Sequence, residues 1–152
     1  MKKIMIISFI IFGLIFFYGC SIDYVGHPKL TVIGDNFTID ATINGGNWFP
    51  KSQGGNSFDL GDWDIERARE ITSENVEASS TLDLILSYKK DIDSFKVYTI
   101  EGTNGFDQKQ TEVECEEYKI KLPSESGEYI YAVKTKWDDT HSVNYLFKVN
   151  IK

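Results

Sequence analysis

The sequence predicts an all-β protein in which about seven antiparallel strands form two packed sheets, a β-sandwich. Apolar residues recur at every second position in seven stretches, the period at which a strand turns alternate side chains to opposite faces. Clusters of Gly, Asn, Asp and Pro separate the stretches, and no long helical interval lies between them. Strands joined in this way pair antiparallel and bury their apolar faces between two sheets.

The first four predicted strands lie at 30–33, 37–44, 82–87 and 94–100. The second has apolar residues at its odd positions and Thr, Asp, Thr and Asn at its even positions. The third alternates three leucines with other residues, starting at Leu82. Each pattern gives the strand one apolar face for a core.

The last three predicted strands lie at 118–122, 129–137 and 145–151. In the second of these, strict alternation places Trp137 on the same face as Tyr129, which assigns Trp137 to the core.

The segment between Asn44 and Thr81 is polar and glycine-rich, and it contains no convincing strand. Its only helical pattern is 64–71, with Asp64 as N-cap and three apolar residues on one side. Long loops in a compact domain are usually functional or disordered, so this segment is the first place to expect a binding surface. Trp48 and Trp63 are its candidate ligand-binding residues, since flat aromatic rings stack on the apolar faces of sugars. Packing in the core or within the loop is the other interpretation of each ring.

Residues 1–20 have the layout of a bacterial lipoprotein signal. Two lysines precede an apolar run that ends at Gly19-Cys20, and Cys20 would receive a lipid after cleavage. This predicts a signal peptide at 1–19, a lipidated N-terminus and tether at 20–29, and one domain at 30–152. An uncleaved membrane helix and a plain secretory signal remain alternatives. The expected location is the extracytoplasmic face of the cell membrane, with a lipid anchor.

The charge of the chain is acidic, with 16 basic and 23 acidic residues and a net charge of −7. Two lysines belong to the signal, so the remainder carries 14 basic and 23 acidic side chains, or −9. This balance argues against nucleic acid as a partner. With Cys20 bearing lipid, Cys115 has no partner for a disulfide and is expected to be a buried strand residue. A reactive or metal-binding thiol is the alternative for Cys115.

The segment from Leu122-Pro123 to Gly127-Glu128-Tyr129-Ile130-Tyr131 resembles the start of strand F in immunoglobulin-like (Ig-like) sandwiches. The resemblance implies that the Tyr129 hydroxyl bonds back to the preceding turn. Tyr131 stands where antibody domains have a cysteine, so the resemblance favours a fibronectin-III-like or bacterial Ig-like variant without that disulfide.

The wider pattern resembles small lipoproteins of Gram-positive bacteria that carry a single Ig-like domain and have no assigned function. The shared closing run is Gly127, Tyr129, Tyr131, Val133, Trp137, Tyr145, Phe147 and Val149. These are core and turn residues, so the resemblance implies a fold and no particular activity.

Catalytic and metal-binding patterns are weak in this sequence. Only His27 and His141 are acid–base groups near neutral pH, and neither accompanies a serine in a G-x-S-x-G elbow, so His141 is expected to be a solvated turn residue. Asp59, Asp62 and Asp64 do not have EF-hand spacing, and a loose calcium site at Asp138-Asp139 is the one alternative to solvated carboxylates. We expect no enzyme activity, no metal and no cofactor.

The sequence therefore predicts a non-catalytic binding or accessory module with an unidentified ligand. Its partners would be the membrane, through the lipid, and a protein or polysaccharide of the cell envelope. Carbohydrate or cell-wall binding through Trp48 and Trp63 is one alternative. Inhibition of an exported enzyme by the 44–81 loops is the other.

Overall fold

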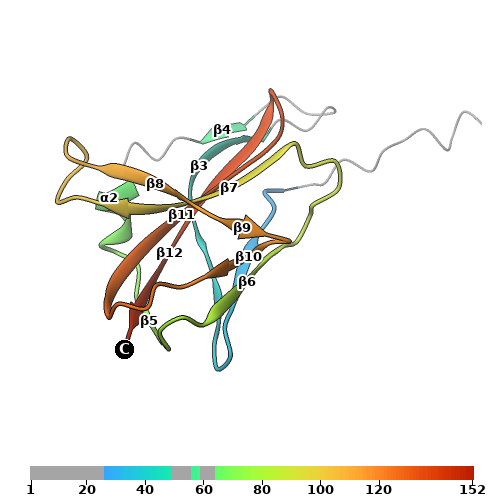
Figure 1. Ribbon diagram of the computed structural model, residues 1–152. Helices are drawn as coiled ribbons and strands as arrows, with labels where there is room; N and C mark the ends of the chain where they lie inside the picture. Colours follow the sequence, from blue (N-terminus) through green and yellow to red (C-terminus); the bar gives the residue numbers. More distant parts are fainter. Residues whose placement is uncertain (1–25, 49–55, 59–63) are drawn as a thin grey trace, which may run out of the picture.

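The computed structural model describes residues 26–48, 56–58 and 64–152, and within these ranges the chain is almost entirely β (Figure 1). One short helix, α2 (Asp64–Ala68), accompanies the strands. The strands are β1 (Leu30–Ile33), β2 (Thr38–Asp40), β3 (Thr42–Trp48), β4 (Asn56–Phe58), β5 (Glu74–Val76), β6 (Thr81–Leu86), β7 (Ser94–Glu101), β8 (Lys109–Val113), β9 (Cys115–Glu116), β10 (Lys119–Lys121), β11 (Gly127–Asp138) and β12 (His141–Ile151).

The strands form two packed sheets. One has five strands in the order β2-β1-β6-β10-β9, and the other has the order β4-β3-β12-β11-β7-β8 with β5 paired to β12 as its seventh strand. Within them, β1-β6-β10-β9 matches the order A-B-E-D of Ig-like domains, and β12-β11-β7-β8 matches G-F-C-C′. The predicted all-β sandwich of two packed sheets is confirmed, and its strand pairs are antiparallel except for β5–β12, which is parallel.

All seven predicted stretches are strands, but the second stretch is divided between the two sheets. β2 pairs with β1, whereas β3 pairs with β12 in the other sheet. The chain crosses over at Ala41, whose N–H donates to the Leu30 carbonyl at 2.8 Å. One uninterrupted alternation in the sequence therefore supplies the edge of one sheet and a strand of the other.

Four further strands, β4, β5, β8 and β9, were not predicted. The expectation that 44–81 lacks strands before Leu82 is wrong, because β3 continues to Trp48 and β4 and β5 follow. β8 has no apolar alternation because it is an edge strand whose residues 109–112 are exposed. Backbone pairing with β7 and β12 holds β8 and β5, respectively, in their sheets.

The main core lies between the sheets, where Tyr131 of β11 stacks on Phe147 of β12 at 5.0 Å between ring centroids. Trp137 is buried there, as predicted. The Tyr129 hydroxyl donates to the Glu125 carbonyl at 3.3 Å, so the expected tyrosine corner is present.

A second apolar cluster lies on the outer face of the seven-stranded sheet. Ile65 and Ala68 of α2 pack there against Ile100, Ala132 and Leu146. The helical prediction for 64–71 is thus confirmed for its first five residues. Because α2 covers this face, β11 and β12 are buried on both sides at these positions.

Cys115 lies in β9 as a free, half-buried thiol, and burial raises its pKa. The structure thus places Cys115 in a strand as expected, although the side chain is less buried than expected.

In the described ranges no helix is both long and apolar enough to cross a membrane.

The chain joins the sandwich earlier than residue 30. The buried Tyr145 hydroxyl donates to the Pro28 carbonyl at 2.7 Å. Lys29 and Ser87 exchange two further bonds, from Lys29 N–H to the Ser87 hydroxyl at 2.8 Å and from Ser87 N–H to the Lys29 carbonyl at 2.9 Å. The last residues of the predicted tether therefore belong to the fold.

The long strands define two ends of the molecule (Figure 1). We call the end that carries the β11–β12 turn, Asp138–His141, the hairpin end; Pro28, Lys29 and the start of β7 lie toward it. We call the end that carries the β7–β8 loop, residues 102–108, the loop end.

Candidate functional site

The hairpin end is formed where β3 ends and where β11 turns into β12. Antiparallel pairing places Trp48 opposite His141, and a register shift between Lys136 and Asp138 marks the turn. Residues far apart in the sequence therefore meet at this end of the seven-stranded sheet.

The rings at the hairpin end pack edge to face. The Trp48 ring lies 5.1 Å from Trp137 and 4.8 Å from His141, with interplanar angles of 88° and 78°. The centroid of the Tyr88 ring lies 6.3 Å from that of Trp137. Trp48 is only 5% exposed, so it offers no open face for a sugar ring and is a packed core residue. The Trp137 indole N–H is buried without a hydrogen-bond partner in the described part of the chain.

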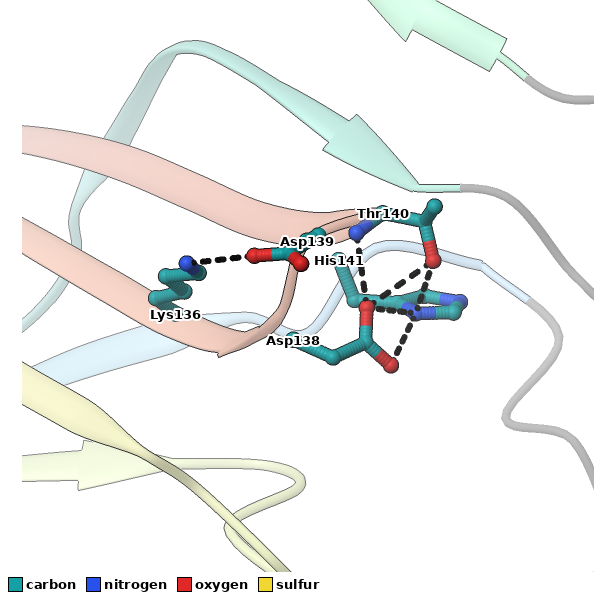
Figure 2. Close-up of polar contacts among 5 residues, drawn as sticks. All are labelled: Lys136, Asp138, Asp139, Thr140 and His141. Atoms are coloured by element: carbon teal, nitrogen blue, oxygen red, sulfur yellow. Dashed lines mark hydrogen bonds and ion pairs between the residues drawn. The ribbon is translucent and has the colours of Figure 1, made fainter.

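His141 is held by Asp138, as Figure 2 shows. Nδ1 of the ring lies 2.8 and 2.9 Å from the two carboxylate oxygens, and the ring is only 15% exposed. The expectation of a solvated His141 is therefore wrong: the ring packs on Trp48, which the sequence did not place beside it.

Asp138 is also bonded to its own turn. Its carboxylate accepts bonds from Thr140 N–H at 2.7 Å and from the Thr140 hydroxyl at 2.9 Å. Burial raises the pKa of Asp138, but these bonds, the bond to His141 and the charge of His141 outweigh that effect and lower the pKa to about 2. The carboxylate is thus ionised at any ordinary pH.

The pair does not have the geometry of a catalytic triad. In a triad, the carboxylate bonds to Nδ1 while the nucleophile approaches Nε2. Here the Thr140 hydroxyl lies 3.1 Å from Nδ1, the same nitrogen that faces Asp138. Thr140 is therefore placed to stabilise the turn rather than to be activated by the imidazole.

The two carboxylates of the turn have different partners. Asp139 accepts a bond from Lys136 at 2.8 Å, whereas Asp138 faces His141 (Figure 2). Among the described residues, no group of three or more His, Cys, Asp or Glu side chains is placed to hold a metal ion.

The remaining predicted site residues, Cys20 and Trp63, lie outside the described residues, as do Asp59 and Asp62. Asp64 is described, and its carboxylate accepts bonds from the amides of Asn44 at 2.6 Å and Gln110 at 2.8 Å. These bonds tie α2 to β3 and β8.

The sequence did not predict a groove along the open edge of the sandwich. It has a volume of about 900 Å³ and is lined by residues of β8 to β10, among them Val113, Glu117 and Lys121. The signal for it would have been the polar run 109–117, which is typical of edge strands rather than of a loop.

No protein-family model matches the chain, and comparison with curated proteins also gives no match.

Proposed function

We propose that this protein is a non-catalytic binding or accessory module, held by a lipid on Cys20 at the extracytoplasmic face of the cell membrane. The observation that carries the proposal is the attachment of Pro28 and Lys29 to the hairpin end, through Tyr145 and Ser87. Seven residues separate Cys20 from Pro28, and they span at most about 25 Å when extended. A lipid on Cys20 would therefore hold the domain by its hairpin end and leave the loop end directed away from the membrane.

The absence of catalysis is part of the proposal. The one histidine–carboxylate pair found among the described residues has its nearest hydroxyl on the wrong ring nitrogen for a triad. That arrangement favours binding over hydrolysis as the task of the domain.

Of the alternatives, carbohydrate binding loses the support of Trp48, because that ring is buried. Trp63 would have to provide the stacking surface by itself. Inhibition of an exported enzyme remains compatible with a tethered module, since it requires a surface that fits a protein.

The lipid anchor is tested by growing cells that produce the full chain with an alkyne-tagged palmitate. We expect label on the wild type and on Cys115→Ser, the matched control, and none on Cys20→Ser, which should leave the membrane fraction. Label that persists on Cys20→Ser, or a wild-type protein with an intact N-terminus by mass spectrometry, would contradict the anchor.

Catalysis is tested with the full chain in detergent, on a panel of esters, peptides and glycosides. We expect turnover no faster than in the blank. Turnover that His141→Ala abolishes would refute a non-catalytic role.

A further inference from the structure

One aromatic side chain of the described structure is almost completely in solvent. Phe106, in the β7–β8 loop, is 95% exposed. Ile85 is the other exposed large hydrophobic residue among those described, and it is 50% exposed from a strand in mid-sheet. Burying a phenylalanine side chain contributes about 1.5–3 kcal/mol, so leaving this ring in water forgoes a stabilisation that folding does not recover.

The loop that carries Phe106 is fixed by its own polar residues. The Asp107 carboxylate accepts bonds from the N–H groups of Thr103 and Asn104, each at 2.8 Å, and from the Thr103 hydroxyl at 2.6 Å. The Phe106 N–H donates to the Asn104 side chain at 2.9 Å. Gly102 is required beside them, because its φ is +135° and a Cβ would lie 2.8 Å from the Asp107 carboxylate.

The loop is also bonded to the helix beside it. The Arg69 guanidinium donates to the Thr103 carbonyl, and Glu66 accepts a bond from the Gly105 N–H at 3.4 Å. At the base of the loop, Gln108 accepts a bond from the Ile65 N–H at 2.9 Å. The loop therefore has two sets of restraints, one internal and one from α2 and Arg69, the residue that follows it.

A fixed loop that presents one aromatic ring has the properties of a binding determinant. Aromatic side chains dominate the energetics of protein interfaces when they fill a pocket in the partner. Restraining the loop before binding removes part of the entropy that binding would otherwise cost. The ring is convex, so its partner must offer a concave apolar pocket.

The position of Phe106 favours a protein partner over a membrane. β7 has eight residues and spans about 25 Å at about 3.3 Å per residue, and it starts at the hairpin end, where Ser94 pairs with Lys136. The β7–β8 loop, which carries Phe106, follows the other end of β7, at the loop end of the molecule (Figure 1). Hydrogen bonds from Thr103 and Asn104 lower the pKa of Asp107, so an ionised carboxylate adjoins the ring and disfavours an anionic lipid surface.

From this geometry we infer that the β7–β8 loop is the contact surface for a protein partner outside the cytoplasm, and that Phe106 inserts into an apolar pocket of that protein. The inference rests on the proposed function, a tethered binding module, and assigns it a surface. The pocket of an exported enzyme is one concave surface of this kind, which connects the loop to the inhibitor alternative.

Site-specific photo-crosslinking in cells that produce the full chain tests the inference. The photoreactive residue p-benzoyl-phenylalanine replaces Phe106, or Ile85 as an exposed control, or Glu117 in the open-edge groove. We expect a discrete protein adduct from position 106 and none from position 85. A protein adduct from position 117 and none from 106 would overturn the loop assignment but leave the binding module standing. Lipid or glycan adducts at position 106 would overturn the choice of a protein partner. No adduct at any position would contradict the binding module as well.

The energetic role of the ring is tested with the partner that the adduct identifies. Phe106→Ala should weaken binding at least tenfold, as expected for a hot-spot residue, whereas Ile85→Ala should leave binding unchanged. Asp107→Ala keeps the ring but removes the bonds that fix the loop, so it should weaken binding several-fold and speed amide exchange at Thr103 and Asn104. Unchanged affinity in Phe106→Ala would refute the inference, provided that its thermal unfolding matches the wild type.

Discussion

The hairpin end and the loop end use the same kinds of residue for opposite purposes. Asp138 accepts a bond from a threonine N–H at one end, and Asp107 does so at the other. At the hairpin end the bonded turn packs through His141 on Trp48, which in turn contacts Trp137. At the loop end the bonded turn carries Phe106, whose ring is in solvent. The comparison teaches that local hydrogen bonding shapes a turn, while the neighbouring sheet decides whether an aromatic ring in it becomes core or surface.

The largest expected effect is on the free energy of unfolding, and it distinguishes the hairpin end from the loop end. Trp137→Ala should lower the free energy of unfolding by about 3–5 kcal/mol, because it opens a cavity beside Trp48 and Tyr88. Urea denaturation followed by circular dichroism measures the change.

The matched control is Phe106→Ala, which removes an aromatic ring at the loop end. It should change the free energy of unfolding by no more than about 0.5 kcal/mol, since the ring is exposed. Comparable losses in the two variants would erase the distinction between the ends.

The next effect concerns the bond that joins the start of the fold to the hairpin end. Tyr145→Phe leaves the Pro28 carbonyl without the hydroxyl that bonds to it at 2.7 Å, which should cost about 1–2 kcal/mol. Hydrogen exchange should also speed up at the Lys29 and Ser87 amides, whose bonds lie beside Pro28. Exchange that rises equally at Thr103 would mean that the loosening is not confined to the hairpin end.

A smaller effect depends on pH. The pKa of Asp138 falls from 3.8 to about 2 on folding, so the ionised carboxylate stabilises the folded state above about pH 4, and that contribution is lost as the pH falls toward 2. Because the side chain is half exposed, solvent screening limits the contribution to about 1 kcal/mol or less. Asp138→Asn should be less stable than the wild type at pH 5, and the difference should shrink by pH 2. A difference that stays constant from pH 5 to pH 2 would show that the carboxylate charge is not its source.

The smallest effect is expected at Asp139, the neighbour of Asp138 in the turn. Asp139→Asn removes an ion pair with Lys136 in which the Asp139 side chain is almost fully exposed, and solvent screens such pairs so that they add little to stability. Chemical denaturation at low and high salt measures it, and we expect less than half the effect of Asp138→Asn. An equal effect would mean that the bond to His141 adds nothing to the stability that Asp138 contributes.

Much of the fold could be predicted because the buried strands alternate strictly. Tyr131, Val133 and Trp137 share the core face of β11, as their spacing indicates. β5 and β8 could not be predicted in this way, because they are short or exposed and their backbone pairs with β12 and β7. Backbone hydrogen bonds to a neighbour leave no pattern in the side chains of an edge strand.

The candidate sites were harder to predict than the strands. The sequence singled out Trp48, but its contact with His141 depends on the register between β3 and β12. Phe106 directly follows a cluster of turn residues, Gly102 to Gly105, and the sequence carries no signal that its ring is exposed. Exposure depends on what packs on the turn, and in this fold α2 and the residue after it, Arg69, bond to the loop at Gly105 and Thr103.

By itself the sequence determined that the chain is all-β, which faces of its strands are apolar, and where its turns and the helix at Asp64 lie. These features follow from local rules, namely the two-residue period of a strand and the backbone preferences of turn residues. Only the tertiary structure decided that β2 and β3 separate into different sheets, that Trp48 closes the hairpin end, and that Phe106 stays in water at the loop end. Those outcomes depend on pairing between residues up to about a hundred positions apart, as Trp48 and His141 are, and local sequence patterns do not encode such contacts.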